Sequence, residues 1–138
     1  MLNIEKCNGC HTCYNICPQK AIMMIEDEKG FKYPQIDKKK CISCGLCEKK
    51  CPVLNKKTND KNDIIAYAAY HKDENIRTQS SSGGIFSAIS EYILNNNGVV
   101  VGAAFDDKFM VKHIIIDKIS ELNKLRKSKY VQSNVGNI

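Results

Sequence analysis

The eight cysteines of this 138-residue chain fall into two short runs with the same spacing, C-x2-C-x2-C-x3-C-P. The first run extends from Cys7 to Pro18, and the second extends from Cys41 to Pro52. Thiolates are soft metal ligands, and this spacing is typical of proteins that hold [4Fe–4S] clusters through four cysteines each. Because no cysteine is left over, the sequence predicts two complete ligand sets and two clusters.

The position of the fourth cysteine in each run indicates how the ligands are shared. A single tight loop can wrap three cysteines around one cluster, and Gly9 and Gly45 lie inside these loops, where the backbone must bend sharply. If the next four residues form a helical turn, the fourth sulfur lies about 6 Å further along the axis and reaches the other cluster instead. The predicted ligand sets are therefore crossed: Cys7, Cys10, Cys13 and Cys51 for one cluster, and Cys41, Cys44, Cys47 and Cys17 for the other.

A structural zinc protein also builds its sites from four cysteines, and it forms a competing hypothesis that the regular repeat fits poorly. Residues 1–6 lack the apolar core of a signal peptide. The longest apolar stretches, 64–70 and 99–105, are far shorter than the ~20 residues of a membrane-spanning helix. We therefore expect a reducing, cytoplasmic location and no membrane span.

The positive charge of the chain is concentrated in its first part. The formal net charge is +6, and residues 1–57 contain 11 lysines against 6 acidic residues, whereas residues 58–138 contain 10 basic and 9 acidic residues. Two clusters with their thiolates, at about −2 each, offset most of this excess. The lysines at 38–40 and 49–50 are predicted to form a solvated rim, with docking of an acidic partner as a hypothesis. No aromatic residues alternate with them, so no nucleic-acid partner is expected.

Three segments are predicted along the chain: a cluster domain over 1–57, a linker over 58–63 and an α/β segment over 64–138. Within the first, an apolar stretch at 21–25, a polar turn ending at Gly30 and an alternating stretch at 31–37 predict a β-hairpin. Its apolar side chains are expected to cover the clusters and keep water from the sulfurs. The candidates for this cover are Ile22, Met24, Phe31, Tyr33 and Ile36.

The composition changes after residue 63, where buried strands and a helix are expected. Residues 64–70 and 99–105 are predicted to be strands buried on both faces, and 109–116 a third strand. A helix is predicted over 85–94, followed by a short helix around 120–125. The apolar face of the first helix is expected to carry Ile85, Ile89, Tyr92 and Ile93. The predicted fold class is α+β: a small ferredoxin-like domain followed by an incomplete α/β domain.

The loop before that helix is a second candidate site. Serine hydroxyls and free backbone N–H groups at a helix N-terminus bind anions such as phosphate, and glycines allow close approach. The candidate residues are Ser81, Ser82, Gly83 and Gly84. An equally good explanation is that Ser81 or Ser82 simply caps the helix.

The first 57 residues, with both cysteine runs intact, resemble a bacterial two-cluster ferredoxin. Residues 81–87, 98–105 and 128–133 resemble the start of the coenzyme F-420 hydrogenase/dehydrogenase β-subunit family. This resemblance implies an iron–sulfur electron-transfer protein, a low-potential one-electron relay of a flavin-dependent oxidoreductase. In a full-length member Lys129 and Tyr130 would join the serine–glycine loop in an FAD phosphate site.

Members of that family continue well beyond residue 133, so the resemblance implies a truncated chain whose flavin and substrate sites are incomplete. The expected partner is a redox protein or the missing C-terminal portion. The alternative is a stand-alone ferredoxin-like carrier whose C-terminal half is a docking domain.

Overall fold

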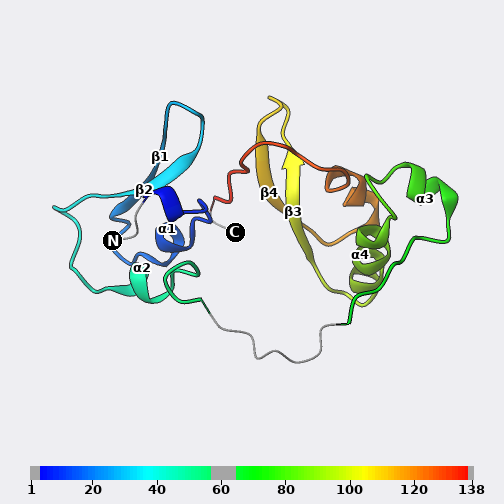
Figure 1. Ribbon diagram of the computed structural model, residues 1–138, viewed down its shortest axis with the longest axis horizontal. Helices are drawn as coiled ribbons and strands as arrows, with labels where there is room; N and C mark the ends of the chain where they lie inside the picture. The colour runs from blue at the N-terminus through cyan, green and yellow to red at the C-terminus, as the bar shows by residue number, and fades with distance from the viewer. Residues whose placement is uncertain (1–3, 57–64, 137–138) are drawn as a thin grey trace. The chain divides into compact units, whose positions relative to one another are not determined.

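The computed structural model describes residues 4–56 and 65–136, and these divide into two compact units, residues 4–56 with 135–136 and residues 65–134 (Figure 1). The predicted linker over 58–63 lies outside the described residues. Residues 54–56 are part of the first unit, because the Asn55 side chain donates hydrogen bonds to the carbonyl oxygens of Glu48 (2.7 Å) and Cys51 (3.1 Å).

The first unit combines short helices with one hairpin. Its elements are η1 (Ile4–Lys6), α1 (Thr12–Ile16), β1 (Ile22–Glu26), β2 (Lys32–Ile36) and α2 (Leu46–Lys49). Strands β1 and β2 pair antiparallel from Ile22↔Ile36 to Glu26↔Lys32, which confirms the predicted hairpin. Its turn forms because Asp27 Oδ1 accepts the N–H groups of Lys29 (2.9 Å) and Phe31 (2.8 Å).

The second unit packs helices against a two-stranded sheet. Its elements are α3 (Glu74–Thr78), α4 (Ile85–Asn95), β3 (Val100–Phe105), β4 (Val111–Ile116) and η2 (Ile119–Lys124). Strands β3 and β4 pair antiparallel from Val100↔Ile116 to Phe105↔Val111. The core is small and draws on α4, both strands and the segment from η2 onward, through Leu94, Ala104, Ile116, Leu122 and Leu125. The chain outside this core is largely exposed, so the unit buries little apolar surface.

One predicted strand of this unit does not form in its described residues, and the strand predicted over 99–105 forms but is less buried than predicted. Residues 65–70 have no regular secondary structure, and their side chains are exposed, Tyr67 at 83%. Strand β3 is buried on one face only, because Val101 and Phe105 on its other face are about half exposed. An apolar stretch becomes a buried strand only where a neighbouring strand and a second covering layer exist, and these depend on the rest of the fold. Residue 64 lies outside the described residues.

Helix α4 forms where it is predicted but buries a different face. Ser87, Ser90 and Leu94 are buried, whereas Ile89 and Tyr92 of the predicted face are exposed. The two serines lack bulk, so the helix can approach the rest of the unit closely on this side.

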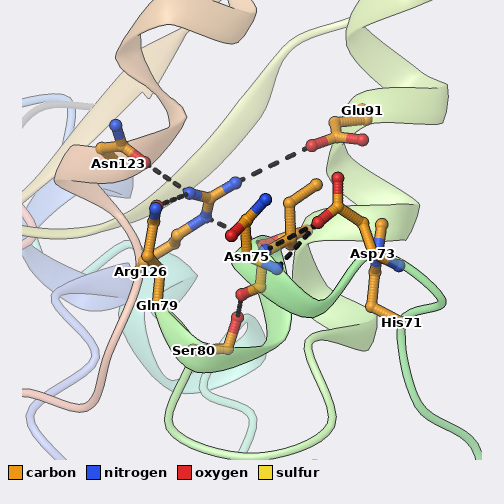
Figure 2. Close-up of polar contacts among 10 residues, drawn as sticks. His71, Asp73, Asn75, Gln79, Ser80, Glu91, Asn123 and Arg126 are labelled. Atoms are coloured by element: carbon orange, nitrogen blue, oxygen red, sulfur yellow. Dashed lines mark hydrogen bonds and ion pairs between the residues drawn. The ribbon is translucent and has the colours of Figure 1, made fainter.

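Arg126, whose side chain is 11% exposed, reinforces this choice of face (Figure 2). Its Nε donates to Ser87 Oγ at 3.0 Å, and its Nη1 donates to Gln79 Oε1 at 2.9 Å and to Asn123 Oδ1. Its Nη2 lies 3.8 Å from Glu91 Oε1. One guanidinium thus links α4 to the C-terminal end of α3 and to η2, and its fixed fork of donors suits that role.

Candidate metal centres

A cavity of about 190 Å³ in the first unit has a wall of thiols and apolar side chains. The loop 7–13 and the N-terminal part of α1 form one side of it, and α2 with the residues after it forms another. Five cysteines line it: Cys7, Cys10, Cys13, Cys47 and Cys51. The fourth cysteine of the second run thus lies in the wall made by the first run.

A second cavity, of about 30 Å³, shows the reciprocal arrangement. Its cysteines are Cys17, Cys41, Cys44 and Cys47. Cys17 leaves its own run and joins the second one, since α1 ends at Ile16 and the chain turns there. Cys47 lines both cavities, so its position does not assign it to one of the two ligand sets.

Backbone N–H groups point at three of the sulfurs. Gly9 N–H donates to Cys7 Sγ at 3.5 Å, and Ser43 N–H donates to Cys41 Sγ at 3.4 Å, at the same place in the two runs. Ala21 N–H donates to Cys17 Sγ at 3.3 Å. Such donors stabilise a thiolate and, in iron–sulfur sites, tune the potential of the group that it binds.

The two loops bend through left-handed backbone at matching positions. Gly9 (φ 64°) corresponds to Ser43 (φ 54°), and His11 (φ 60°) corresponds to Gly45 (φ 71°). Sequence reasoning identified only the two glycines, because a serine or histidine carries no local signal for this conformation. His11 is 4% exposed and its ring meets that of Tyr14 edge to face at 5.9 Å. This packing holds the histidine in a conformation that it would otherwise avoid.

The hairpin covers the larger cavity in part as predicted. Ile22, Met24 and Ile36 line it, whereas Phe31 is about half exposed. Burial raises the pKa of the Cys13 thiol to about 11, so this thiol keeps its proton unless a metal displaces it.

The thiols line the walls of cavities and do not converge on a point. Within residues 4–56 and 65–136, no three His, Cys, Asp or Glu side chains form a group that could hold a metal ion. Four sulfurs around one zinc ion at 2.3 Å would lie about 3.8 Å apart. The donor set, the N–H groups aimed at sulfur and the apolar cover fit a wider group, and a [4Fe–4S] cluster has that chemistry.

The serine–glycine loop of the second unit has a structural explanation. Gly84, with a φ of 78°, is the N-cap of α4, so neither Ser81 nor Ser82 caps the helix. A Cβ at Gly83 would lie 2.7 Å from the Ala69 carbonyl oxygen, and the Gly83 oxygen accepts the N–H of His71 at 2.6 Å. The glycines therefore allow residues 69–71 to approach the loop closely.

The structure brings the predicted flavin residues near one another but engages one of them elsewhere. Ser81 Oγ accepts the N–H of Ser128 at 3.2 Å, so the loop and the segment containing Lys129 and Tyr130 are in contact. Tyr130 is 93% exposed. The Lys129 ammonium donates to the carbonyl oxygens of Lys124 (3.2 Å), Arg126 (2.7 Å) and Lys127 (3.1 Å). Because an ammonium has three N–H groups, Lys129 would have to leave these partners to bind a phosphate.

The cysteine geometry and the family comparisons agree on the class of protein. The family of 4Fe–4S dicluster domains matches residues 6–55, and a second family of the same description matches the overlapping range 40–87. The chain is a ferredoxin-like iron–sulfur electron carrier. The coenzyme F420 hydrogenase/dehydrogenase, beta subunit N-terminal domain, matches residues 66–138, more than half of the chain. The chain belongs to this family, with the dicluster domain in front.

Relatives of the chain include a ferredoxin and subunits of larger enzymes from archaea and bacteria. An uncharacterized ferredoxin of Methanocaldococcus jannaschii is 37% identical over 65 residues, which cover 42% of this chain and 83% of the relative. The pyruvate synthase subunit PorD of the same organism is 46% identical over 54 residues, or 38% of this chain and 57% of the relative.

A component of the Na(+)-translocating ferredoxin:NAD(+) oxidoreductase complex of Acetobacterium woodii is 44% identical over 46 residues, or 33% of this chain and 13% of the relative. The chain thus spans most of the uncharacterized ferredoxin but only smaller shares of the other two relatives. None of the helices in the described part of the chain is long and apolar enough to cross a membrane.

Proposed function

We propose that the chain relays single electrons at low potential through two [4Fe–4S] clusters held by crossed ligand sets. The observation that carries the proposal is the lining of the two cavities, in which Cys51 accompanies Cys7, Cys10 and Cys13, and Cys17 accompanies the second run. A bound [4Fe–4S] cluster supplies one-electron chemistry, at roughly −400 mV in ferredoxins of low potential.

The chain's own residues bind the clusters, exclude water and adjust the charge at sulfur. The cysteine thiols lose their protons on binding, and the raised pKa of Cys13 makes this loss dependent on the metal. Ile22 and Ile36 line both sites and Met24 lines the larger one, and these apolar side chains keep water out, which lowers the potential. The N–H donors from Gly9 and Ser43 act in the opposite sense. Thiolate ligands require reducing conditions, and a cytoplasmic location is part of the proposal.

The crossed ligation is tested by two single substitutions, Cys17→Ser and Cys51→Ser. Cys17→Ser should damage the cluster of Cys41, Cys44 and Cys47 and leave the other largely intact, and Cys51→Ser should do the reverse. Electron paramagnetic resonance of the anaerobically reduced variants would show which cluster signal is lost. To identify each signal, Cys7→Ser and Cys41→Ser serve as reference variants for the two runs. If each fourth-cysteine variant matches the reference of its own run, the assignment is wrong.

We further propose that these electrons reach a flavin in the complete oxidoreductase, which converts one-electron steps into a two-electron transfer. The match of residues 66–138 to the β-subunit domain supports this role. The engagement of Lys129 by three carbonyl groups favours the alternative, a stand-alone carrier whose second unit only docks. Flavin absorbance that survives desalting of the purified chain would support the first role and contradict the second.

A further inference from the structure

The two cysteine loops differ sharply in their exposure to solvent. In the first loop Gly9 and His11 are buried and Cys10 is half-buried. In the second loop Ile42, Ser43, Cys44 and Gly45 are all exposed, and Ile42 reaches 61%. Of the eight cysteines, Cys44 is the one classed as exposed. The second loop therefore offers the shorter path between a bound cluster and a protein at the surface.

Lysines surround this exposed loop. Lys38 and Lys39 lie in the turn directly before Cys41, where Cys41 N–H donates to the Asp37 carbonyl oxygen at 3.0 Å. Lys49 lies one helical turn after Gly45, since its N–H donates to the Gly45 carbonyl oxygen at 3.0 Å, and Lys50 follows it. All four lysines are exposed, and within the described residues none of them forms a salt bridge. Asp37 is already paired with Lys40, at 3.8 Å.

The first loop lacks such a border, because Glu5 and Lys6 precede it with opposite charges and Tyr14, Asn15 and Ile16 follow without charge. The positive charge of the first unit is thus concentrated around the more open of its two cysteine loops. A small exposed apolar group with a pair of lysines before it and another pair after it in the chain is a surface that suits fast, transient association with an oppositely charged partner.

We propose that residues 42–45 together with Lys38, Lys39, Lys49 and Lys50, here called the Cys44 face, are the docking surface for an acidic one-electron carrier protein. Ile42 makes the central apolar contact, and the four lysines pair with carboxylates of the partner. In the transfer the partner is oxidised by one electron and this chain is reduced by one, with no bond formed or broken and no proton required. The proposal rests on the proposed iron–sulfur function and adds the entry point and the chemistry of the partner.

The test measures binding of an acidic flavodoxin to the full chain with its clusters assembled, by calorimetry under anaerobic conditions. The charge-reversal variant Lys38→Glu/Lys39→Glu changes the Cys44 face. The matched control is Lys29→Glu/Lys108→Glu, which makes the same change in net charge at exposed lysines in the two hairpin turns. We expect the face variant to weaken binding by about tenfold and the control by less than about threefold, because exposed charges act mainly at short range.

The dependence of binding on salt concentration and on the charge of the partner provides two further tests. Binding should weaken steeply between about 0.01 M and about 1 M salt, as the Debye length falls from ~30 Å to ~3 Å. Ile42→Gln should weaken binding at both salt concentrations, since it removes an apolar contact. A basic probe, cytochrome c, should bind at least about tenfold more weakly than flavodoxin.

Equal weakening by the face and control variants would overturn the proposal, and so would equal binding of the two probes or no detectable binding of flavodoxin at low salt. Iron and sulfide content is determined for each variant before titration. A chain without clusters would contradict the proposed function, whereas a cluster-loaded chain that fails these binding tests would contradict the docking surface alone.

Discussion

Gly45→Ala tests whether the cysteine loops depend on their left-handed residues. Gly45 has a φ of 71°, and a Cβ added there would meet no atom within 4 Å, so the cost is conformational and not steric. A left-handed conformation costs an L-residue about 1–2 kcal/mol, and alanine recovers about 0.4–1 kcal/mol by restricting the unfolded chain. The free energy of unfolding should therefore fall by about 1 kcal/mol. For a domain of this size, that lowers the melting temperature by about 4–8 °C.

Two further substitutions, at the other left-handed residues Ser43 and His11, test whether stability changes in the expected direction. Ser43→Gly should raise stability by about 1 kcal/mol, because Ser43 has a φ of 54° and an exposed side chain that makes little packing contribution. His11→Gly should lower it, since losing a buried ring costs about 2–5 kcal/mol and exceeds the conformational gain of about 1 kcal/mol.

The assay is anaerobic thermal loss of the cluster absorbance at one fixed scan rate for all variants. A lower midpoint for Ser43→Gly, or an unchanged midpoint for Gly45→Ala, would refute the assignment of these positions as conformationally strained.

Three other predictions follow from the same structure. Anaerobically purified protein should contain about eight iron and eight sulfide per chain, and stoichiometric zinc without acid-labile sulfide would contradict this. Gly83→Ala should destabilise the second unit by more than about 2 kcal/mol in denaturant unfolding, because its Cβ would lie 2.7 Å from the Ala69 oxygen, whereas Ser82→Ala should have little effect. Arg126→Met should lower the free energy of unfolding of the second unit by about 2–3 kcal/mol, because the hydrogen bonds to Ser87, Gln79 and Asn123 are lost. Lys118→Met, at an exposed lysine, is the control, and an equal loss of stability there would argue against that network.

The features predicted correctly from the sequence are those that a short stretch of chain specifies by itself. The hairpin of β1 and β2 follows from two alternating stretches and a turn that Asp27 and Gly30 close within five residues. The extent of α4 follows from its helical periodicity. The repeated cysteine spacing predicts iron–sulfur clusters because loop geometry around a cluster is local, and the family comparisons support clusters of this kind.

What only the tertiary structure decided are the features that depend on a distant neighbour. Residues 65–70 are apolar but do not form a strand, and α4 turns its serine face inward because Arg126, 39 residues after Ser87, approaches that side. The roles of Ser81, Ser82, Gly83, Gly84, Lys129 and Tyr130 in cofactor binding stay predictions. His11 and Ser43 adopt a glycine-like conformation that their own side chains disfavour, and for His11 the contacts that hold it come from the folded loop. Apolar content and local propensity indicate which conformation and which degree of burial a residue prefers. The pairing of a strand, the buried face of a helix and the strain at a residue depend on which other parts of the chain pack against it.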